Sequence, residues 1–197
     1  MRRTSAALGS SASWITSQQT SDADLLARLQ RDDTDALELA LKEHWWLVVD
    51  YINRLTGSED AAEDIAQRAF CQLWDRRAQW RLTGSLRALL CRIARNYAVS
   101  EHRRQRADER SAETFVELTR PVSPLRDRIE TEQLRSALDR EIALLPERRR
   151  EILVLRCVHD LSYKEIADVM NIAQQTVANQ LSSALATLRV SLRDQLD

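Results

Sequence analysis

Glycine and proline are scarce in this chain, with only 3 of each among its 197 residues. Strands joined by tight turns need such residues at almost every turn, so their scarcity excludes a many-turned sandwich or barrel. Long helices need few breakers, and apolar residues make up 44% of the chain, enough for a packed interior. We therefore predict an all-α protein, of a length that suits one or two domains.

Apolar side chains recur at helical spacing in the first half of the chain. Between residues 34 and 55 they fall at Leu37, Leu41, Trp45, Val48 and Ile52, which share one face of a helix. Three further helices complete this half: one capped by Asp22, one over 59–76 after a break at Gly57, and one from Ser85 to 106 after the connector 77–84.

The second half begins with a different composition. Residues 107–123 are polar and acidic and show no helical period, which predicts a flexible linker. Helices are expected over 124–144 and from Leu145 to Val158. A last helix, 174–196, carries Val177, Leu181, Leu185 and Leu188 on one face. The chain is thus expected to form two small helical domains, 21–106 and 124–197, joined by the flexible linker 107–123, after a disordered Ser/Thr-rich lead at 1–20.

The formal net charge of -1 hides an uneven distribution of charge. Residues 21–80 hold 13 acidic and 7 basic side chains, whereas residues 81–106 hold 7 arginines and a single glutamate. A basic block confined to one helical segment favours contact with a polyanion. No segment has the ~18 consecutive apolar residues of a membrane span. We expect a cytoplasmic protein with no membrane insertion.

The cysteines and histidines do not indicate a metal or disulfide site. Cys71, Cys91 and Cys157 are widely spaced, and the chain has no C-x-x-C pair. The histidines at 44, 102 and 159 add no zinc-ligand spacing. We expect the cysteines to be small core residues in a reducing cytosol. With no nucleophile–base set or phosphate loop either, we predict no enzyme activity and no cofactor.

Residues 162–189 carry the most informative pattern. Ser162 and Glu165 have the spacing of a capping box for a short helix, and a tight turn at Asn171-Ile172 leads to a longer one. This arrangement is typical of a helix-turn-helix, with an ordinary polar helical hairpin as the alternative. The exposed positions of the second helix carry amides and hydroxyls, which suit base edges in the major groove: Gln174, Gln175, Thr176, Asn179, Gln180 and Ser183.

Several segments resemble the extracytoplasmic-function (ECF) subfamily of bacterial RNA polymerase sigma factors. The promoter-reading region 4 is similar to SYKEIADVMNIAQQTVANQLSSALATLR, preceded by LPERRREILVLR. The clamp-binding segment of region 2 resembles DIAQRAFCQLWDRR, and its promoter-melting segment resembles SLRALLCRIARNYAVSEHRRQR. The segments occur in the family's order over about 22–192, with no room for the intervening domain of primary sigma factors.

The resemblance implies an alternative sigma factor. Its region-2 domain, 21–106, would bind core RNA polymerase and recognise and melt the minus-ten element. Its region-4 domain, 124–197, would recognise the minus-thirty-five element. The implied partners are the clamp helices of the largest polymerase subunit, the beta flap, promoter DNA and an anti-sigma factor.

The resemblance also assigns residues to the first domain. The position after Gln67 is usually acidic in the family, and Arg68 occupies it here, which changes the polarity of the docking surface. The residues implied for polymerase binding are Asp64, Gln67, Phe70, Leu73 and Trp74. Those implied for minus-ten DNA are Gln79, Trp80, Arg81, Thr83, Arg92, Arg95, Asn96, Arg103 and Arg104, with arginines for phosphate and Trp80 for stacking on a base or sealing the loop.

In the second domain the expected phosphate contacts are Arg149, Arg150, Arg156 and Lys164, beside the polar side chains named above for the base edges. No positive charge lies between Lys164 and Arg189. We therefore predict weak upstream binding by this domain alone, with recognition through polar contacts and DNA shape.

The residues alone leave two other functional interpretations open. A dimeric helix-turn-helix regulator needs a receiver or ligand-binding domain, and residues 21–80 show no alternating strands for one. A helical adaptor with no nucleic-acid role is the other reading. Binding to core RNA polymerase separates a sigma factor from both.

Overall fold

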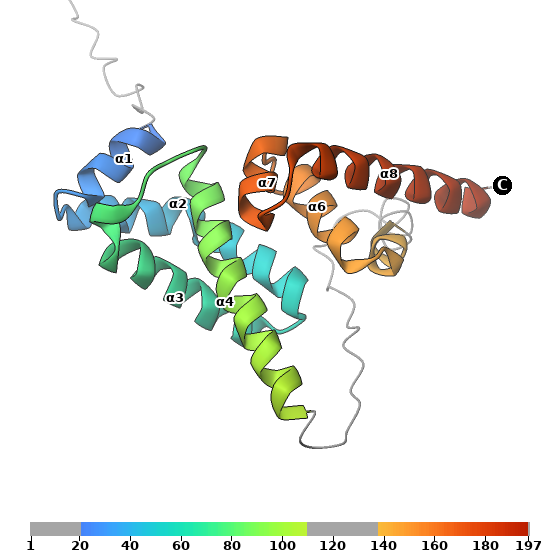
Figure 1. The fold of residues 1–197 in the computed structure, drawn as a ribbon, viewed down its shortest axis with the longest axis horizontal. Coiled ribbons are helices and arrows are strands. Elements are labelled where there is room, and N and C mark those ends of the chain that lie inside the picture. The colour runs from blue at the N-terminus through green and yellow to red at the C-terminus, as the bar shows by residue number, and fades with distance from the viewer. Residues whose placement is uncertain (1–20, 110–137, 197) are drawn as a thin grey trace, which may run out of the picture.

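The computed structural model describes residues 21–109 and 138–196, and every regular element in these ranges is helical, as predicted. The N-terminal helix group comprises α1 (Asp22–Leu29), α2 (Thr34–Thr56), α3 (Glu59–Asp75), the short 3-10 helix η1 (Arg77–Gln79) and α4 (Leu86–Glu109). The C-terminal helix group comprises α6 (Glu147–Cys157), α7 (Tyr163–Met170) and α8 (Gln174–Leu196), and residues 138–144 before it are also helical (Figure 1).

The ends of several helices follow from local chemistry, as predicted. Gly57 ends α2 with φ 71°, a left-handed conformation that favours glycine. The Ser162 and Glu165 capping box is formed at the start of α7. Helix α4 continues to Glu109, so residues 107–109 are helical rather than linker. The expected lead 1–20, residues 110–123 of the linker and residues 124–137 of the next helix lie outside the described residues.

The prediction that Asp22 caps α1 is wrong. Ser21 is the N-cap, and its hydroxyl accepts a hydrogen bond from the Asp24 amide at 3.1 Å. The Asp22 carboxylate instead accepts from the Leu86 amide at 2.7 Å, at the start of α4. The first turn of a helix has amides without partners inside the helix, and its dipole attracts a carboxylate. Asp22 therefore joins α1 to the beginning of α4.

In the N-terminal helix group, α2, α3 and α4 pack on one another. Small residues on α3, Ala62, Ala66 and Ala69, are fully buried, which allows the neighbouring helices to approach closely. On α2 the expected Val48 and Ile52 are fully buried, but the first part of the expected face is wrong. Ala36 and Ala40 are fully buried there, while Leu37, Leu41 and Trp45 are half-buried. The larger side chains at 37, 41 and 45 still pack against the core from its margin.

The C-terminal helix group has its own core between α6, α7 and α8. Its largest fully buried side chains include Ile152, Leu155 and Ile166. The expected face of α8 is wrong at Leu185, which is 44% exposed, whereas Ala184 is fully buried. A period of 3.6 residues takes the buried face from position 181 to 184 and 188, and leaves 185 at its margin.

The two helix groups contact each other. The first half of α4 packs against α7, and α2 touches α6 (Figure 1). These contacts join residues far apart in the sequence and place the helix-turn-helix beside the basic helix. The connector before α4 also lies at this junction.

The expectation of buried cysteines is wrong for two of the three. Cys91 is fully buried on α4, and burial raises its pKa to about 12, whereas Cys71 and Cys157 are exposed. Within residues 21–109 and 138–196, no cluster of His, Cys, Asp and Glu is arranged to hold a metal ion. The helices in these same ranges are all too short or too polar to cross a bilayer.

Candidate nucleic-acid and polymerase interfaces

Helices α7 and α8 form a helix-turn-helix. The left-handed Asn171, with φ 53°, ends α7, and the Ile172 amide donates to the Ala167 carbonyl at 3.0 Å. Val177 is fully buried and anchors the first turns of α8 against the core. The opposite side of these turns is solvent-exposed and uncharged. We call it the α8 polar edge: Gln174, Gln175, Thr176 and Asn179.

The α8 polar edge is partly preorganised. The Gln175 amide donates to the Asn179 side-chain oxygen at 3.0 Å. Gln180, predicted to be exposed, is half-buried and accepts from the Arg149 guanidinium at 3.2 Å. Ser183 is also half-buried. Gln180 and Ser183 therefore lie at the margin of the edge rather than on it.

The cations expected to contact upstream phosphates have different surroundings. Arg150 donates to the Ala143 carbonyl at 3.2 Å. Arg156 pairs with Asp160 at 2.9 Å and also donates to the Leu161 carbonyl, so its charge is partly compensated within the turn before α7. Lys164 is exposed on the first turn of α7.

Helix α4 carries the residues expected to contact minus-ten DNA on more than one face. Asn96, Arg103 and Arg104 are exposed, and Arg104 forms an ion pair with Glu101 at 2.6 Å. Arg92 is half-buried and lines the pocket beside the connector. Arg95 is different, because it points to the C-terminal helix group and binds Glu151.

The connector before α4 is held in place by Trp80. Its indole N–H donates to the Leu73 carbonyl at 3.1 Å, and its own carbonyl accepts from Gln30 at 3.1 Å. The ring is half-buried and packs against the core, so it seals the connector. Gln79 and Arg81 are exposed on either side of it.

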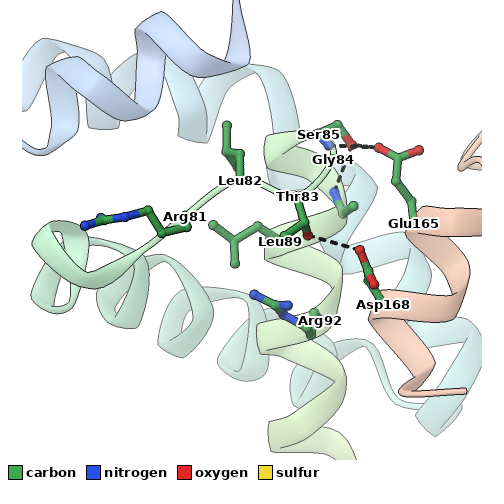
Figure 2. Close-up of a pocket in the computed structure, with 10 residues that line it drawn as sticks. Arg81, Leu82, Thr83, Gly84, Ser85, Leu89, Arg92, Glu165 and Asp168 are labelled. Atoms are coloured by element: carbon green, nitrogen blue, oxygen red, sulfur yellow. Dashed lines mark hydrogen bonds between the residues drawn. The ribbon is translucent and has the colours of Figure 1, made fainter.

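Figure 2 shows the pocket where the connector meets α7. The Thr83 hydroxyl donates to the Asp168 carboxylate at 3.0 Å. One oxygen of Glu165 accepts from the amide of Ser85 at 2.9 Å and from its hydroxyl, and the other accepts from the amide of Ser162 at 2.9 Å. Glu165 therefore bridges the first turns of α4 and α7.

The bridge changes the acidity of Glu165. Partial burial alone raises the pKa of this carboxyl, but the hydrogen bonds from Ser85 and Ser162 outweigh burial and lower it to about 2. Hydrogen bonds to the charged form favour ionisation. The sequence predicted the capping role of Glu165 but not its bond to Ser85, because no local pattern indicates a partner 80 residues away.

A second junction is buried between α2, α4 and α6. The Glu151 side chain is 4% exposed and accepts from Arg95 at 2.7 and 3.2 Å. It also accepts from the hydroxyl of the buried Tyr51 at 2.6 Å. Burial and the neighbouring Glu151 raise the pKa of Tyr51, so this side chain stays a neutral donor. Of these three residues, only Arg95 is expected from the sequence to belong to a functional site.

The residues expected to bind polymerase lie on α3 and differ in how far they are exposed. Asp64 and Gln67 are exposed, whereas Phe70 and Leu73 belong to the core, with 4% and 0% exposure. Trp74 is half-buried, with the Arg77 guanidinium 4.4 Å from its ring centre. Burial removes Phe70 and Leu73 from any docking surface in this conformation.

Arg68, the residue that departs from the family pattern, makes two contacts. It pairs with Asp64 at 3.5 Å and lies 4.4 Å from the centre of the Tyr97 ring on α4. Arg68 thereby joins the exposed side of α3 to α4 and partly compensates the charge of Asp64.

Two family models match the chain in the order of the two helix groups. The model for Sigma-70 region 2 matches residues 41–108, and the model for Sigma-70 region 4 matches residues 135–188. The first covers most of α2, α3 and α4, and the second covers α6, α7 and most of α8.

Curated relatives agree with these matches. The ECF RNA polymerase sigma-E factor of Escherichia coli K12 is 30% identical over 177 residues, covering 85% of this chain and 92% of that protein. The probable RNA polymerase sigma factor RfaY of Xanthomonas campestris pv. campestris is 30% identical over 148 residues. That match covers 73% of this chain, which spans only 37% of the length of RfaY.

Solved structures show the same fold. The sigma factor RpoE from Bartonella quintana, crystallised with the anti-sigma factor NepR, matches 83% of this chain and 98% of its own with a TM-score of 0.65 at 21% identity. CnrH, in complex with the cytosolic domain of CnrY, matches 88% of this chain and 97% of its own with a TM-score of 0.63 at 18% identity. This protein belongs to the ECF family of RNA polymerase sigma factors.

Proposed function

We propose that this chain acts in the cytoplasm as an alternative sigma factor that directs core RNA polymerase to promoters with two recognition elements. The α8 polar edge is the observation that carries the proposal. Its amides and hydroxyl project from the second helix of a helix-turn-helix, the element that enters the major groove in such motifs. Amide side chains suit adenine edges through paired hydrogen bonds, so this edge is assigned to the minus-thirty-five element.

The N-terminal helix group is assigned to the minus-ten element. Its exposed Arg103 and Arg104, with Arg92 near the connector, provide positive charge along α4. Arginines that follow a single strand neutralise its phosphates and make binding depend on salt. Because Trp80 is held by Leu73 and Gln30, the sealing role suits it better than stacking on a base.

The core polymerase is assigned to the exposed side of α3. Asp64 and Gln67 supply polar contacts there, with the half-buried Trp74 at its end. Phe70 and Leu73 support this surface from below. Arg68 gives it a mixed charge in place of a purely acidic one.

Transcription in vitro with Escherichia coli core polymerase tests the assignment of α8. Templates carry two random windows, and RNA sequencing identifies the promoters that the full chain selects. The double variant Gln175→Ala/Asn179→Ala should relax the upstream preference, because each good paired contact to a base contributes about 1–3 kcal/mol of discrimination. Thr187→Val is the control, because Thr187 is exposed further along α8 and its hydroxyl donates to the Ser183 carbonyl of the same helix. An unchanged upstream preference in the double variant contradicts the proposal.

Competition with a labelled sigma factor for core polymerase tests the assignment of α3. Asp64→Ala/Gln67→Ala should weaken binding to core, and Glu38→Ala on the exposed side of α2 should not. Equal binding by all three proteins contradicts this surface.

We also propose an anti-sigma protein as a partner. Of the two structural neighbours above, the sigma factor RpoE was solved in complex with the anti-sigma factor NepR, and CnrH in complex with the cytosolic domain of CnrY. The C-terminal helix group exposes large apolar side chains at Leu185 and Val190, 44% and 62% exposed, which suit burial against a partner. Co-expression with a protein encoded beside this chain should yield a stable complex that blocks transcription. Transcription at the same rate with that protein present contradicts the pairing.

A further inference from the structure

Helix α1 bonds to both ends of the segment that joins η1 to α4, and we call residues 80–86 the connector span. At the C-terminal end of α1 the Gln30 side chain donates to the Trp80 carbonyl at 3.1 Å. At the N-terminal end the Asp22 carboxylate accepts from the Leu86 amide at 2.7 Å. The connector span therefore runs alongside α1, which holds its first and last residues (Figure 1).

Helix α1 is itself fixed to the rest of the N-terminal helix group. Leu25 and Leu29 are 1% and 0% exposed and belong to the core. Asp32, in the turn after α1, forms an ion pair with Arg77 of η1, just before the connector span. A helix that is packed along one face and paired at its end has little freedom to shift. The two bonds from α1 therefore fix two points at a constant separation.

The bond from Gln30 reaches a side chain that is expected to contact minus-ten DNA. The Trp80 carbonyl that accepts from Gln30 also accepts from the Arg81 guanidinium at 3.1 Å. Arg81 is exposed, whereas the Trp80 ring packs against the core and donates to the Leu73 carbonyl. Gln30 therefore helps to fix the carbonyl that holds an exposed guanidinium at the start of the connector span.

The bond from Asp22 fixes the other end of the connector span. Amides in the first turn of a helix have no acceptor within that helix, and the helix dipole favours a carboxylate beside them. Asp22 supplies this acceptor to the amide of Leu86, whose side chain is fully buried. Both ends of the connector span are thus ordered by the protein itself. A segment that is ordered in advance loses less conformational freedom on binding.

We propose that Gln30 and Asp22 are positioning residues for promoter recognition, which act through α1 to hold the connector span in the conformation that discriminates between minus-ten bases. This inference rests on the proposed function, because it takes Gln79 and Arg81 as contacts to minus-ten DNA. A site that adopts its binding conformation only part of the time binds with an affinity reduced by that fraction. Phosphate contacts do not depend on the bases, so loss of either bond lowers discrimination more than overall binding.

Substitutions of similar volume remove each bond separately. Gln30→Met keeps the length of the side chain but has no donor for the Trp80 carbonyl. Asp22→Leu has no acceptor for the Leu86 amide, whereas Asp22→Asn removes the same charge and keeps an acceptor oxygen. Ile65→Val on α3 is the control for stability, because it removes one buried carbon and leaves both bonds in place.

The transcription assay described above tests the proposal with the full chain, on templates with a fixed upstream element and a random minus-ten window. Gln30→Met and Asp22→Leu should each lower discrimination between minus-ten bases about two- to tenfold, the range that corresponds to one hydrogen bond. Asp22→Asn and Ile65→Val should retain most of it. Preference in a random upstream window and competition for core polymerase should not change in any of these variants.

Three outcomes overturn the inference. One is wild-type discrimination in both Gln30→Met and Asp22→Leu. Another is a loss in Asp22→Asn as large as in Asp22→Leu. The third is a parallel loss of minus-ten preference, upstream preference and core binding, because it indicates a purely structural role. Arg81→Ala separates this inference from the proposed function. If Arg81→Ala lowers minus-ten discrimination and Gln30→Met does not, the positioning role alone fails; if neither lowers it, the assignment of the connector to DNA fails as well.

Hydrogen exchange of the Leu86 amide, measured by nuclear magnetic resonance on the full chain, tests the bond from α1 directly. The amide should exchange at least about tenfold faster in Asp22→Leu than in the wild type, since a hydrogen bond to a charged group can account for such a factor. Asp22→Asn should remain closer to the wild type. An unchanged exchange rate in Asp22→Leu overturns the inference, because α1 then does not hold this end of the connector span.

Discussion

Removal of the Glu151 carboxylate should have a large and specific effect on stability. Glu151→Ala leaves the Arg95 guanidinium and the buried Tyr51 hydroxyl without their acceptor. Loss of one partner of a buried ion pair costs about 3–5 kcal/mol. Because the Arg95 side chain keeps 19% exposure, we expect a loss near the lower end, about 3 kcal/mol. The loss of stability cannot exceed the free energy that holds the two helix groups together. If the groups separate, water hydrates Arg95 and the cost of its buried charge disappears.

Replacement of both charges should be far milder than removal of one. Glu151→Leu/Arg95→Met fills a similar volume with apolar atoms, a change that is often neutral for buried pairs. We expect this double variant to be more stable than Glu151→Ala, and to lose at least about 2 kcal/mol less than the sum of its two single variants. Tyr51→Phe in the same background removes the hydroxyl that then lacks an acceptor, and should restore stability further.

Urea unfolding at pH 7, monitored by the circular dichroism signal of the helices, measures these differences in the free energy of unfolding from the midpoint and slope of each transition. Coincident curves from tryptophan fluorescence establish that one transition is observed. A loss below about 1 kcal/mol for Glu151→Ala would refute the reasoning, since removal of one partner of a buried pair costs several times more. Additive single variants would refute it as well, because independent side chains do not form a buried pair.

Three further predictions concern pH and a helix end. Burial lowers the pKa of His159 from 6.5 to about 4, so the unfolded chain binds a proton that the folded chain does not. Stability should therefore fall as pH decreases through this window. Burial also lowers the pKa of His44, so His159→Asn should reduce, but not abolish, the difference between urea midpoints at pH 7 and 5. The pKa of Glu165 lies at about 2, below its usual 4.5, so the ionised carboxylate contributes fully to folding stability above pH 4.5. The difference in stability between the wild type and Glu165→Gln should therefore shrink between pH 7 and 3. A constant difference contradicts the bridge. Gly57→Ala places a side chain at φ 71° and should cost about 1 kcal/mol, seen as a lower Tm, whereas an unchanged Tm contradicts the left-handed cap.

The helices and their ends were largely predictable because their signals are local. The Ser162 and Glu165 capping box needs only two residues three positions apart, and Gly57 marks a helix end by its own conformational freedom. Which of two neighbouring residues caps a helix was harder to predict. Ser21 caps α1 in place of Asp22 because the Asp22 carboxylate has a second partner, the Leu86 amide, which no local pattern reveals.

The surfaces of the helices were less predictable than their existence. Leu185 follows the apolar period of α8 but is 44% exposed, since the small Ala184 faces the close packing between helices instead. The contacts between the helix groups were not predictable at all. The family resemblance assigns Arg95 to DNA, whereas Glu151, 56 residues later, lies beside it only once both groups are folded. A single sequence indicates charges but not their long-range partners.

The junction also has a consequence for synthesis on the ribosome. The N-terminal helix group folds from contacts within residues 21–109, but Tyr51 meets its acceptor 100 residues later in the chain and Arg95 meets it 56 residues later. At roughly 5–20 residues per second, translation separates Arg95 from Glu151 by about 3–11 s. Arg95 of each new molecule is thus synthesised several seconds before its carboxylate partner Glu151. The junction between α2, α4 and α6 can therefore form only after α6 has been translated, so it belongs to the last stage of folding.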